Sequence, residues 1–385
     1  MNEQFPHVML PQVTHDELAR QNFVQSLASH INQQMTQGNK VIYEKVVKPR
    51  FEREHQRPPK DRHEIRVSME KEPYYQWWSA LRRTQQELMW ESVTCSVERQ
   101  LCELIQCAKD NSGDLGSLTL EPDFKIPAYQ TAVDIHCMPG GYHSEFIEDD
   151  VTAGAIYDRG VYVYGRGWLG PLNDDMGQSI VHNYLKQEYL DFQPAKILDM
   201  GCSVGHSTVP YVDAYPEAEV YAIDIGASLL RYGHARAEAL GKRVYFSQQN
   251  AEHTNFPDQS FDLIVSHILL HEIPKSALYK VFDECYRLLA PGGMMIHVEA
   301  PLYRHMDIYT AFIYDWQTAN NNEPFWSAMR ELDLMAIATE AGFEADNAIE
   351  TFVPNGVWKT LAPTSSIKTV NFSSRGTWFV MAASK

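Results

Sequence analysis

The sequence predicts an α/β fold, with a mostly parallel sheet of seven strands, helices on both faces of the sheet, and a mainly helical N-terminal extension. Two apolar runs, each ending at or beside an acid, occupy 196–200 and 219–224, and a glycine turn and a helix-like segment separate them. That order is typical of a β–α–β unit. Such segments alternate as far as residue 300, whereas residues 1–110 show mainly helical patterns. Strands separated by helical crossovers form parallel sheets.

The elements of the sheet domain follow in chain order. A helix over 178–189 leads into the first strand. Strands are expected near 196–200, 219–224, 243–248, 261–266 and 294–299, with helices near 206–214, 227–240 and 276–289. Beyond residue 300 we expect helices over 307–318 and 324–341, strands over 343–352 and 377–383, and a long loop over 354–376. Gly241 and Gly342 are typical helix stops.

Three regions are expected: a helical extension over 1–127, a lid and linker over 128–190, and the sheet domain over 191–385. Residues 77–108 contain no Gly or Pro, and apolar residues from Val97 to Ala108 fall on one face at helical spacing. That face predicts packing on the sheet domain or on a second copy of the chain, so a homodimer through these helices is one expectation. Residues 110–127 have the composition of a linker.

Two stretches of the extension each have two interpretations. The aromatic residues Tyr74, Tyr75, Trp77 and Trp78 either cover a bound ligand or pack the helical region on its neighbour. Residues 45–66 alternate bases with acids. They form either a surface for an anion or partner, or a solvated helical face with internal ion pairs.

The composition excludes some partners. The 385 residues carry a formal net charge of −17, with 50 acids against 33 bases. An acidic chain is a poor ligand for nucleic acid or for an anionic membrane surface. The six cysteines contain no C-x-x-C pair, so a zinc cluster is not expected. No apolar run is long enough to span a membrane and no signal peptide is evident, so we expect a cytoplasmic protein.

The glycine loop after the first strand has two interpretations. A dinucleotide site is built on G-x-G-x-x-G, but here Ser203 stands between Gly201 and Gly205. Asp199 lies just before the loop and would repel a pyrophosphate. A cationic ligand without phosphate suits such an acid, and Asp224, at the end of the second strand, is placed to bind ribose hydroxyls.

The stretch 196–226 resembles motifs I and II of the class I S-adenosyl-L-methionine (SAM)-dependent methyltransferases, which have a Rossmann-like fold. Asn250-Ala251-Glu252, the segment 256–265 and the turn 287–293 resemble later segments of the same family, most of all its quinone-biosynthesis C-methyltransferase branch. Ser203 and Asn250 depart from the usual Gly and Asp. The resemblance implies that 191–385 is a SAM-binding domain with an antiparallel final strand.

The resemblance also implies a set of site residues. The expected SAM contacts are Asp199, Gly201, Ser203, Gly205, Asp224, Ile225, Asn250, Ala251, Ser266 and, from the lid, Arg166 toward the SAM carboxylate. The expected substrate contacts are His143, Tyr164, Glu299 and Tyr303.

Candidate catalytic groups lie where the strands end. His271 is the first choice as base or substrate-positioning group, with His267 and Tyr142 as further candidates. The alternative for His271 is a structural imidazole bonded to backbone, and Glu272 fits the first turn of a helix. A metal site from His267, His271, Glu299 and His305 lacks regular ligand spacing, so no metal is expected.

Three functions are compatible with these residues. The leading hypothesis is methyl transfer from SAM to a small-molecule acceptor. The second is a SAM-consuming enzyme that cyclises SAM or eliminates from it and releases methylthioadenosine. The third is a non-catalytic SAM-binding partner subunit, with the N-terminal helices as its interaction surface. Fold alone does not decide among them.

Overall fold

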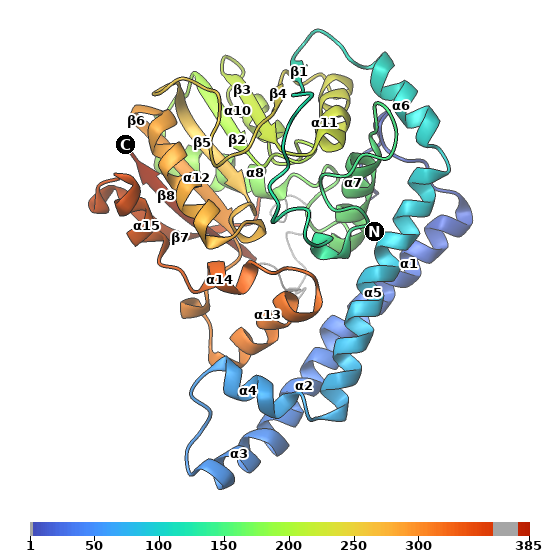
Figure 1. The fold of residues 1–385 in the computed structure, drawn as a ribbon, viewed down its shortest axis with the longest axis vertical. Helices are drawn as coiled ribbons and strands as arrows, with labels where there is room; N and C mark the ends of the chain where they lie inside the picture. The colour runs from blue at the N-terminus through green and yellow to red at the C-terminus, as the bar shows by residue number, and fades with distance from the viewer. Residues whose placement is uncertain (1–2, 357–375) are drawn as a thin grey trace.

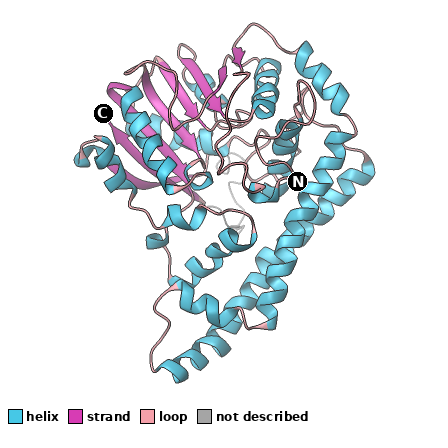
Figure 2. Cartoon of the chain, viewed as in Figure 1, coloured by secondary structure: helices cyan, strands magenta, loops and turns pink. Residues whose placement is uncertain are grey.

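A computed structural model describes residues 3–356 and 376–385 and shows an α/β domain with a long helical arm (Figures 1 and 2). The sheet order is β1-β4-β3-β2-β5-β6-β8-β7. The paired strands are parallel except that β8 runs antiparallel to both β6 and β7. The strands are β1 Ser117–Thr119, β2 Lys196–Met200, β3 Glu219–Asp224, β4 Tyr245–Gln248, β5 Phe261–His267, β6 Leu289–Glu299, β7 Ala348–Pro354 and β8 Thr377–Ser384. The expected α/β fold is confirmed.

The sheet has eight strands where seven were expected. The additional strand, β1, comes from the stretch 110–127, which was predicted to be a linker, and it pairs in parallel with β4 at the sheet edge. Three residues are too few to show a period of two, so the pattern could not identify this strand. The loop predicted over 354–376 lies outside the described residues except at its two ends.

Helices cover both faces of the sheet because successive side chains of a buried strand point to opposite faces. In β2, Leu198 and Met200 join the core formed with α12 and α15, whereas Ile197 joins the core formed with α8 and α10. The helices of this domain are α7 Thr152–Gly165, α8 Asp175–Ile180, η4 Val181–Leu185, α9 Lys186–Glu188, α10 Val209–Ala214, α11 Ala227–Ala239, α12 Lys275–Leu288, α13 Ile308–Asn320, α14 Trp326–Arg330 and α15 Leu334–Ala341, with short turns η3 Ile135–Cys137, η5 Leu270–Glu272, η6 Tyr303–His305 and η7 Ala345–Asn347.

The N-terminal helices form an arm that passes along one side of the sheet domain and extends beyond it (Figure 1). One continuous helical rod runs from residue 15 to 55 and contains two π-helical stretches. Its members are α1 His15–His30, η1 Ile31–Met35, α2 Thr36–Ile42, η2 Tyr43–Val47 and α3 Lys48–His55, and the return path is α4 Arg62–Met69, α5 Pro73–Glu98 and α6 Leu101–Asp110. Helix α5 packs on α7, so the arm and the sheet domain share a core that includes Trp90 and Val163.

The aromatic cluster of the arm packs against α13. Tyr75 and Trp78 are buried, and their rings lie 5.4 and 5.6 Å from those of Phe312 and Trp316. Trp77, in contrast, is 70% exposed. The cluster therefore attaches the arm to the sheet domain and does not line the cavities described below.

The basic stretch 45–66 forms ion pairs with carboxylates of the arm and of α13. Arg57 makes two bonds of 2.7 Å to Glu64, and Arg66 contacts Asp315 of α13 at 3.1 Å. These contacts correspond to the interpretation as a helical face with ion pairs. Among the described residues, no helix has the length and apolar character needed to cross a membrane.

The contact between α7 and α11 gives a first testable prediction. A Cβ atom at Gly154 would lie 2.3 Å from Cβ of Tyr232 and 3.1 Å from the carbonyl oxygen of Ser228. We expect Gly154→Ala to lower the free energy of unfolding by about 1–2 kcal/mol, because the overpacking exceeds the gain in helix propensity. Urea denaturation measures the change. Gly38→Ala in α2 is the comparison variant: its added methyl would lie 2.2 Å from the hydroxyl oxygen at the end of the half-buried Tyr74 side chain, which can turn aside, so we expect a smaller loss than at Gly154.

Candidate active site

Two adjoining cavities open at the carboxyl ends of the parallel strands. One, beside the ends of β3 and β4, has an empty volume of about 770 Å³, and the other, beside the ends of β2, β5 and β6, has about 1060 Å³; both volumes include space open to solvent. They share Gly201, Ser203 and His267 in their walls, along with Tyr142 and Tyr157. Open α/β sheets bind ligands at this edge, next to the point where the strand order reverses. We call them the cofactor cavity and the acceptor cavity.

Asp224 is the central polar group of the cofactor cavity. One carboxylate oxygen accepts from the backbone N–H of Ser203 and the other from that of Gly226, each at 2.9 Å. Burial raises the pKa of this carboxyl and nearby Asp199 adds to the rise, although these backbone donors oppose it. Gly201 has a φ of 72°, which turns the chain sharply at the cavity wall. Asp224 is thus fixed by the glycine loop and faces the cavity.

The far end of the cofactor cavity contains Asn250, Ala251 and Glu252, together with Tyr129. Asn250 accepts from the backbone N–H of Glu252 at 2.9 Å, and the Tyr129 hydroxyl donates to Glu252 at 2.7 Å. A residue of the predicted lid region therefore closes this end. Sequence reasoning did not identify Tyr129, because it lies in a stretch without a regular pattern.

The walls of both cavities carry several acidic side chains. Asp199, Asp224, Glu252 and Glu272 line them, and the described lining residues include neither Lys nor Arg. A pyrophosphate has no counterion here, whereas an ammonium or sulfonium group does. Of the two interpretations of the glycine loop, the site geometry favours the cationic ligand without phosphate.

Asp199 and His267 belong to a buried chain of hydrogen bonds. The Thr208 hydroxyl donates to Asp199 at 2.5 Å, and Nδ1 of His267 lies 3.3 Å from the same carboxylate. The other nitrogen of His267 lies 3.1 Å from the Tyr211 hydroxyl. Since both ring nitrogens have protein partners, His267 is better placed to hold the cavity floor than to accept a proton.

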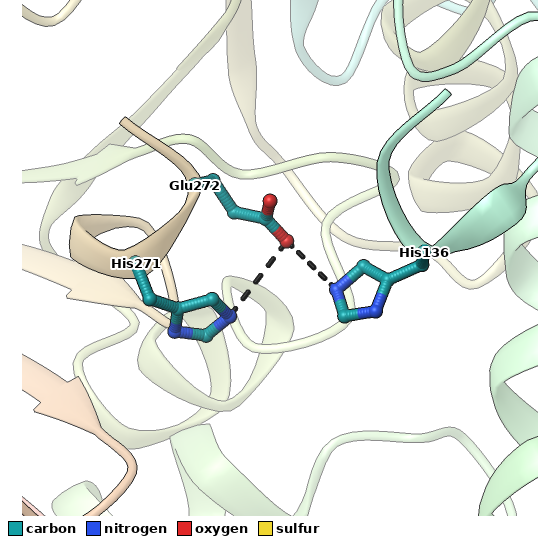
Figure 3. Close-up of side chains that lie close together, drawn as sticks. All are labelled: His136, His271 and Glu272. Atoms are coloured by element: carbon teal, nitrogen blue, oxygen red, sulfur yellow. Dashed lines mark hydrogen bonds and ion pairs between the residues drawn. The ribbon is translucent and has the colours of Figure 1, made fainter. Parts of the chain in front are cut away.

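A polar cluster closes the acceptor cavity where it meets the cofactor cavity (Figure 3). Oε1 of Glu272 lies 2.9 Å from Nε2 of His136 and 3.7 Å from Nε2 of His271. The Tyr142 hydroxyl donates to the same oxygen at 3.3 Å. On the far side, Nδ1 of His271 lies 2.6 Å from Glu299, and Nδ1 of His136 lies 3.0 Å from Glu323.

The ionisation of this cluster follows from its contacts. Burial alone would lower the pKa of His136, but the carboxylates of Glu323 and Glu272 outweigh it and raise that pKa well above the usual value. Burial also lowers the pKa of His271, but nearby carboxylates, mainly that of Glu299, outweigh burial, so the pKa of His271 is raised as well. Burial raises the pKa of Glu272, yet His136 and His271 bring it below its usual value. At neutral pH Glu272 is therefore ionised between two imidazoles.

The structure brings most of the predicted residues together at the cavities. These are Asp199, Gly201, Ser203, Asp224, Ile225, Asn250, Ala251, Tyr142, Tyr164, His267 and His271. Gly205, Ser266, His143, Glu299, Tyr303 and Arg166 do not line either cavity.

The residues outside the cavities have other contacts. Glu299 lies behind His271 and orients it, and Gly205 has a φ of 76° within the loop. Tyr303 donates to Asp315 at 3.0 Å, beneath the guanidinium of Arg62. Arg166 adopts a left-handed backbone at the end of α7 and bonds to Ser29 of the arm. The binding roles expected for these residues stay predictions.

Several cavity residues were not identified from the sequence. His136 lies in an irregular stretch and has a φ of 55°. Its carbonyl accepts from Trp90 at 2.7 Å and from Gln86 at 3.1 Å, so helix α5 of the arm holds it in place. His206 stacks on Tyr157 with ring centroids 5.7 Å apart. The arm helix α5 positions His136, and α7 of the sheet domain positions His206, so both depend on tertiary packing.

A buried histidine under the site gives a second prediction. His297 of β6 is fully buried, and its Nδ1 lies 2.7 Å from the Ser266 hydroxyl. Burial, helped by His267, lowers its pKa to about 3. Below about pH 6.5 His297 binds a proton in the unfolded chain but not in the folded chain. The free energy of unfolding is therefore highest above that pH and decreases as the pH falls toward 3.

His297→Gln should remove this pH dependence. Relative to the variant, the wild-type free energy of unfolding is expected to fall by about 2 kcal/mol between pH 7 and pH 5. Urea titrations at the two pH values measure the difference. Parallel pH profiles of the two proteins would show that His297 is already charged in the folded state.

Comparison with known proteins places the central domain in a class. Residues 197–293 match the family described as "Methyltransferase domain". The malonyl-[acyl-carrier protein] O-methyltransferase of Methylococcus capsulatus is 30% identical over 139 residues, 35% of this chain and 47% of that protein. The demethylmenaquinone methyltransferase of Thermus thermophilus is 33% identical over 113 residues, which are 29% of this chain and 50% of that protein. The tRNA N(3)-methylcytidine methyltransferase Mettl2 of Drosophila melanogaster is 29% identical over 110 residues, which are 27% of this chain and 34% of that protein.

Residues 197–293 are therefore similar to a methyltransferase domain, and SAM is the cofactor that such a domain implies. The acidic walls around Asp199 and Asp224 fit that cofactor, whose ammonium and sulfonium are both cationic. The chain spans half or less of the length of these relatives, and their names indicate different acceptors. All three relatives are named as methyltransferases, and their names differ in the acceptor.

Proposed function

We propose that the protein transfers the methyl group of SAM to a small-molecule acceptor that carries an ionisable hydroxyl group. The observation that supports this proposal is the acceptor cavity, which adjoins the cofactor cavity and has walls of aromatic side chains. These are Trp90, Tyr142, Tyr157, Tyr164, Trp168, Trp326 and Trp378. Such walls suit a compact, largely apolar molecule, with the His271–Glu272 end as its polar anchor.

The residues of the two cavities have distinct roles in this reaction. Asp224 binds the ribose hydroxyls, and Asn250 and Ala251 lie where the adenine binds. When bound, SAM supplies a methyl group that the acceptor takes by in-line displacement, as the S–CH3 electron pair returns to sulfur. The aromatic walls hold the acceptor in line and exclude water. The hydroxyl proton passes to the His271–Glu272 pair, in which Glu272 is the ionised member.

The charge of the chain supports a small acceptor over a nucleic acid. One relative is named for methylation of tRNA, but this chain has a net charge of −17, and the residues described in its cavity walls include neither Lys nor Arg. Phosphate contacts require such groups. We place the protein in small-molecule metabolism in the cytoplasm, and a homodimer through the N-terminal helices remains a prediction.

A transfer assay tests the acceptor class. The full chain is incubated with methyl-labelled SAM and either a small-molecule extract or total tRNA. We expect label in the acid-soluble, extractable fraction and none above background in precipitated RNA. Label in the RNA would contradict the small-molecule proposal. If SAM is consumed but no acceptor is labelled, the SAM-cyclising or SAM-eliminating alternative takes its place.

A further inference from the structure

We propose that His136, His271 and Glu272 bind a divalent transition-metal ion that contacts the acceptor. The metal site is inferred from these side chains alone. The role of the ion toward the acceptor rests on the proposed function. No metal was expected from the amino-acid pattern, because His136 is separated from the other two residues by more than a hundred positions.

The three side chains present one donor atom each to a common point. Nε2 of His136, Nε2 of His271 and a carboxylate oxygen of Glu272 all lie within 4.8 Å of one another. Figure 3 shows both imidazole rings directed at the Glu272 carboxylate. Donor atoms around a tetrahedral zinc ion are about 3.3 Å apart, given metal–ligand distances near 2 Å. The separations from Oε1 of Glu272, 2.9 and 3.7 Å, lie on either side of that spacing, and the donor atoms of the two histidines lie within 4.8 Å of each other.

Two further carboxylates, those of Glu299 and Glu323, hold both histidines in the orientation that metal ligands adopt. Glu299 contacts Nδ1 of His271 at 2.6 Å, and Glu323 contacts Nδ1 of His136 at 3.0 Å. Both acids are buried, with side chains 0% and 1% exposed. Metal-binding histidines almost always donate their second N–H to a carboxylate, a carbonyl or water. Here the same arrangement occurs at both rings and leaves both Nε2 atoms facing Glu272.

Acidic side chains surround both histidines of the cluster. Three carboxylates, those of Glu272, Glu299 and Glu323, surround two imidazoles in a buried region. The cationic side chain of Arg330 is also buried close by and stacks on Trp326 at 4.6 Å. Its nitrogens have no hydrogen-bond partner within the described part of the chain, so it does not pair with these acids directly. A divalent ion would take the place of the protons on the two Nε2 atoms.

Three protein ligands leave coordination positions open, which is typical of catalytic metal sites. His136 and His271 both line the acceptor cavity. A hydroxyl of the acceptor bound to the ion would lose its proton to water more readily. Its oxygen would then bond to the methyl carbon as the S–CH3 bond breaks. Because Nε2 of His271 cannot both bind a metal and take part in proton transfer, the ion replaces the His271–Glu272 pair as the activating group.

Metal binding by the full chain tests the site directly. The protein is stripped with a chelator and titrated at mildly alkaline pH with Co²⁺, followed by its visible absorption, and with Zn²⁺, followed by calorimetry. We expect one ion per chain. His136→Ala and Glu272→Gln should weaken binding at least about 100-fold, and Glu323→Gln about 10–100-fold. His63→Ala, at an exposed position of α4, should bind as the wild type does.

The outcomes separate the metal site from the proposed function. Loss of binding in the two ligand variants, with circular dichroism and SAM affinity retained, supports the site. Absence of binding in the wild type, or equal binding in the wild type and both ligand variants, overturns it. Full methyl transfer by metal-free enzyme overturns the role of the ion and leaves the proposed function intact. One bound ion without any methyl transfer supports the site and contradicts the proposed function.

Discussion

Asp224→Ala is expected to weaken SAM binding by about 100- to 1000-fold. The carboxylate lies at the end of β3 in the cofactor cavity and accepts from the backbone N–H groups of Ser203 and Gly226. Its loss removes the ribose contacts and also frees the glycine loop. Two hydrogen bonds to a charged group contribute about 3–4 kcal/mol, which corresponds to that range of affinity. Isothermal titration calorimetry with SAM measures the change.

Asp191→Ala provides the matched control for this prediction. Asp191 is exposed and precedes β2, outside both cavities. The control should bind SAM with wild-type affinity. The SAM affinity of Asp224→Asn should lie between those of Asp191→Ala and Asp224→Ala, because the single amide oxygen replaces only one of the two carboxylate acceptors. If Asp224→Ala binds SAM as tightly as the control does, the cofactor cavity is assigned wrongly.

His271→Gln is expected to lower kcat by about 100-fold or more with little change in the affinity for SAM. His271 lines the acceptor cavity and is absent from the walls of the cofactor cavity. It stacks on Trp326 at 4.3 Å and is held by Glu299, so glutamine can fill its place without its chemistry. General acid–base groups contribute about 100- to 10,000-fold. Steady-state kinetics and SAM calorimetry on the same preparation separate the two effects.

The decrease in kcat of His271→Gln is expected whether His271 takes part in proton transfer or binds a metal ion. A variant that keeps the wild-type kcat would contradict both roles. A variant that also loses SAM affinity would indicate collapse of the cavity. His182→Ala, at an exposed position outside both cavities, is the control for histidine removal.

The sequence predicted the sheet well where strands are long and buried. The strands expected at 196–200 and 219–224 have the bounds of β2 and β3. In these segments the apolar run, the terminal acid and the glycine turn all indicate the same structure. Strand β1 could not be found, because it has three residues and depends on its pairing with β4.

The residues of the candidate site show the same difference between local and tertiary signals. Asp199 and Asp224 could be identified because they directly follow or end predicted strands, so the fold fixes their position. His136 could not, because helix α5 of the arm positions it through Trp90 and Gln86. Arg166 was expected at the SAM carboxylate, but its place at the end of α7 brings it to Ser29. Contacts between the arm and the sheet domain have no local signal in the sequence.

The by-product of SAM is the measurement that tests the central claim most directly. The purified chain is incubated with SAM and a small-molecule extract of its source, and the products are identified by mass spectrometry against an enzyme-free control. Methyl transfer predicts S-adenosylhomocysteine, formed in proportion to the methylated acceptor. Methylthioadenosine in its place would show attack at another carbon of SAM and would contradict the assignment as a methyltransferase.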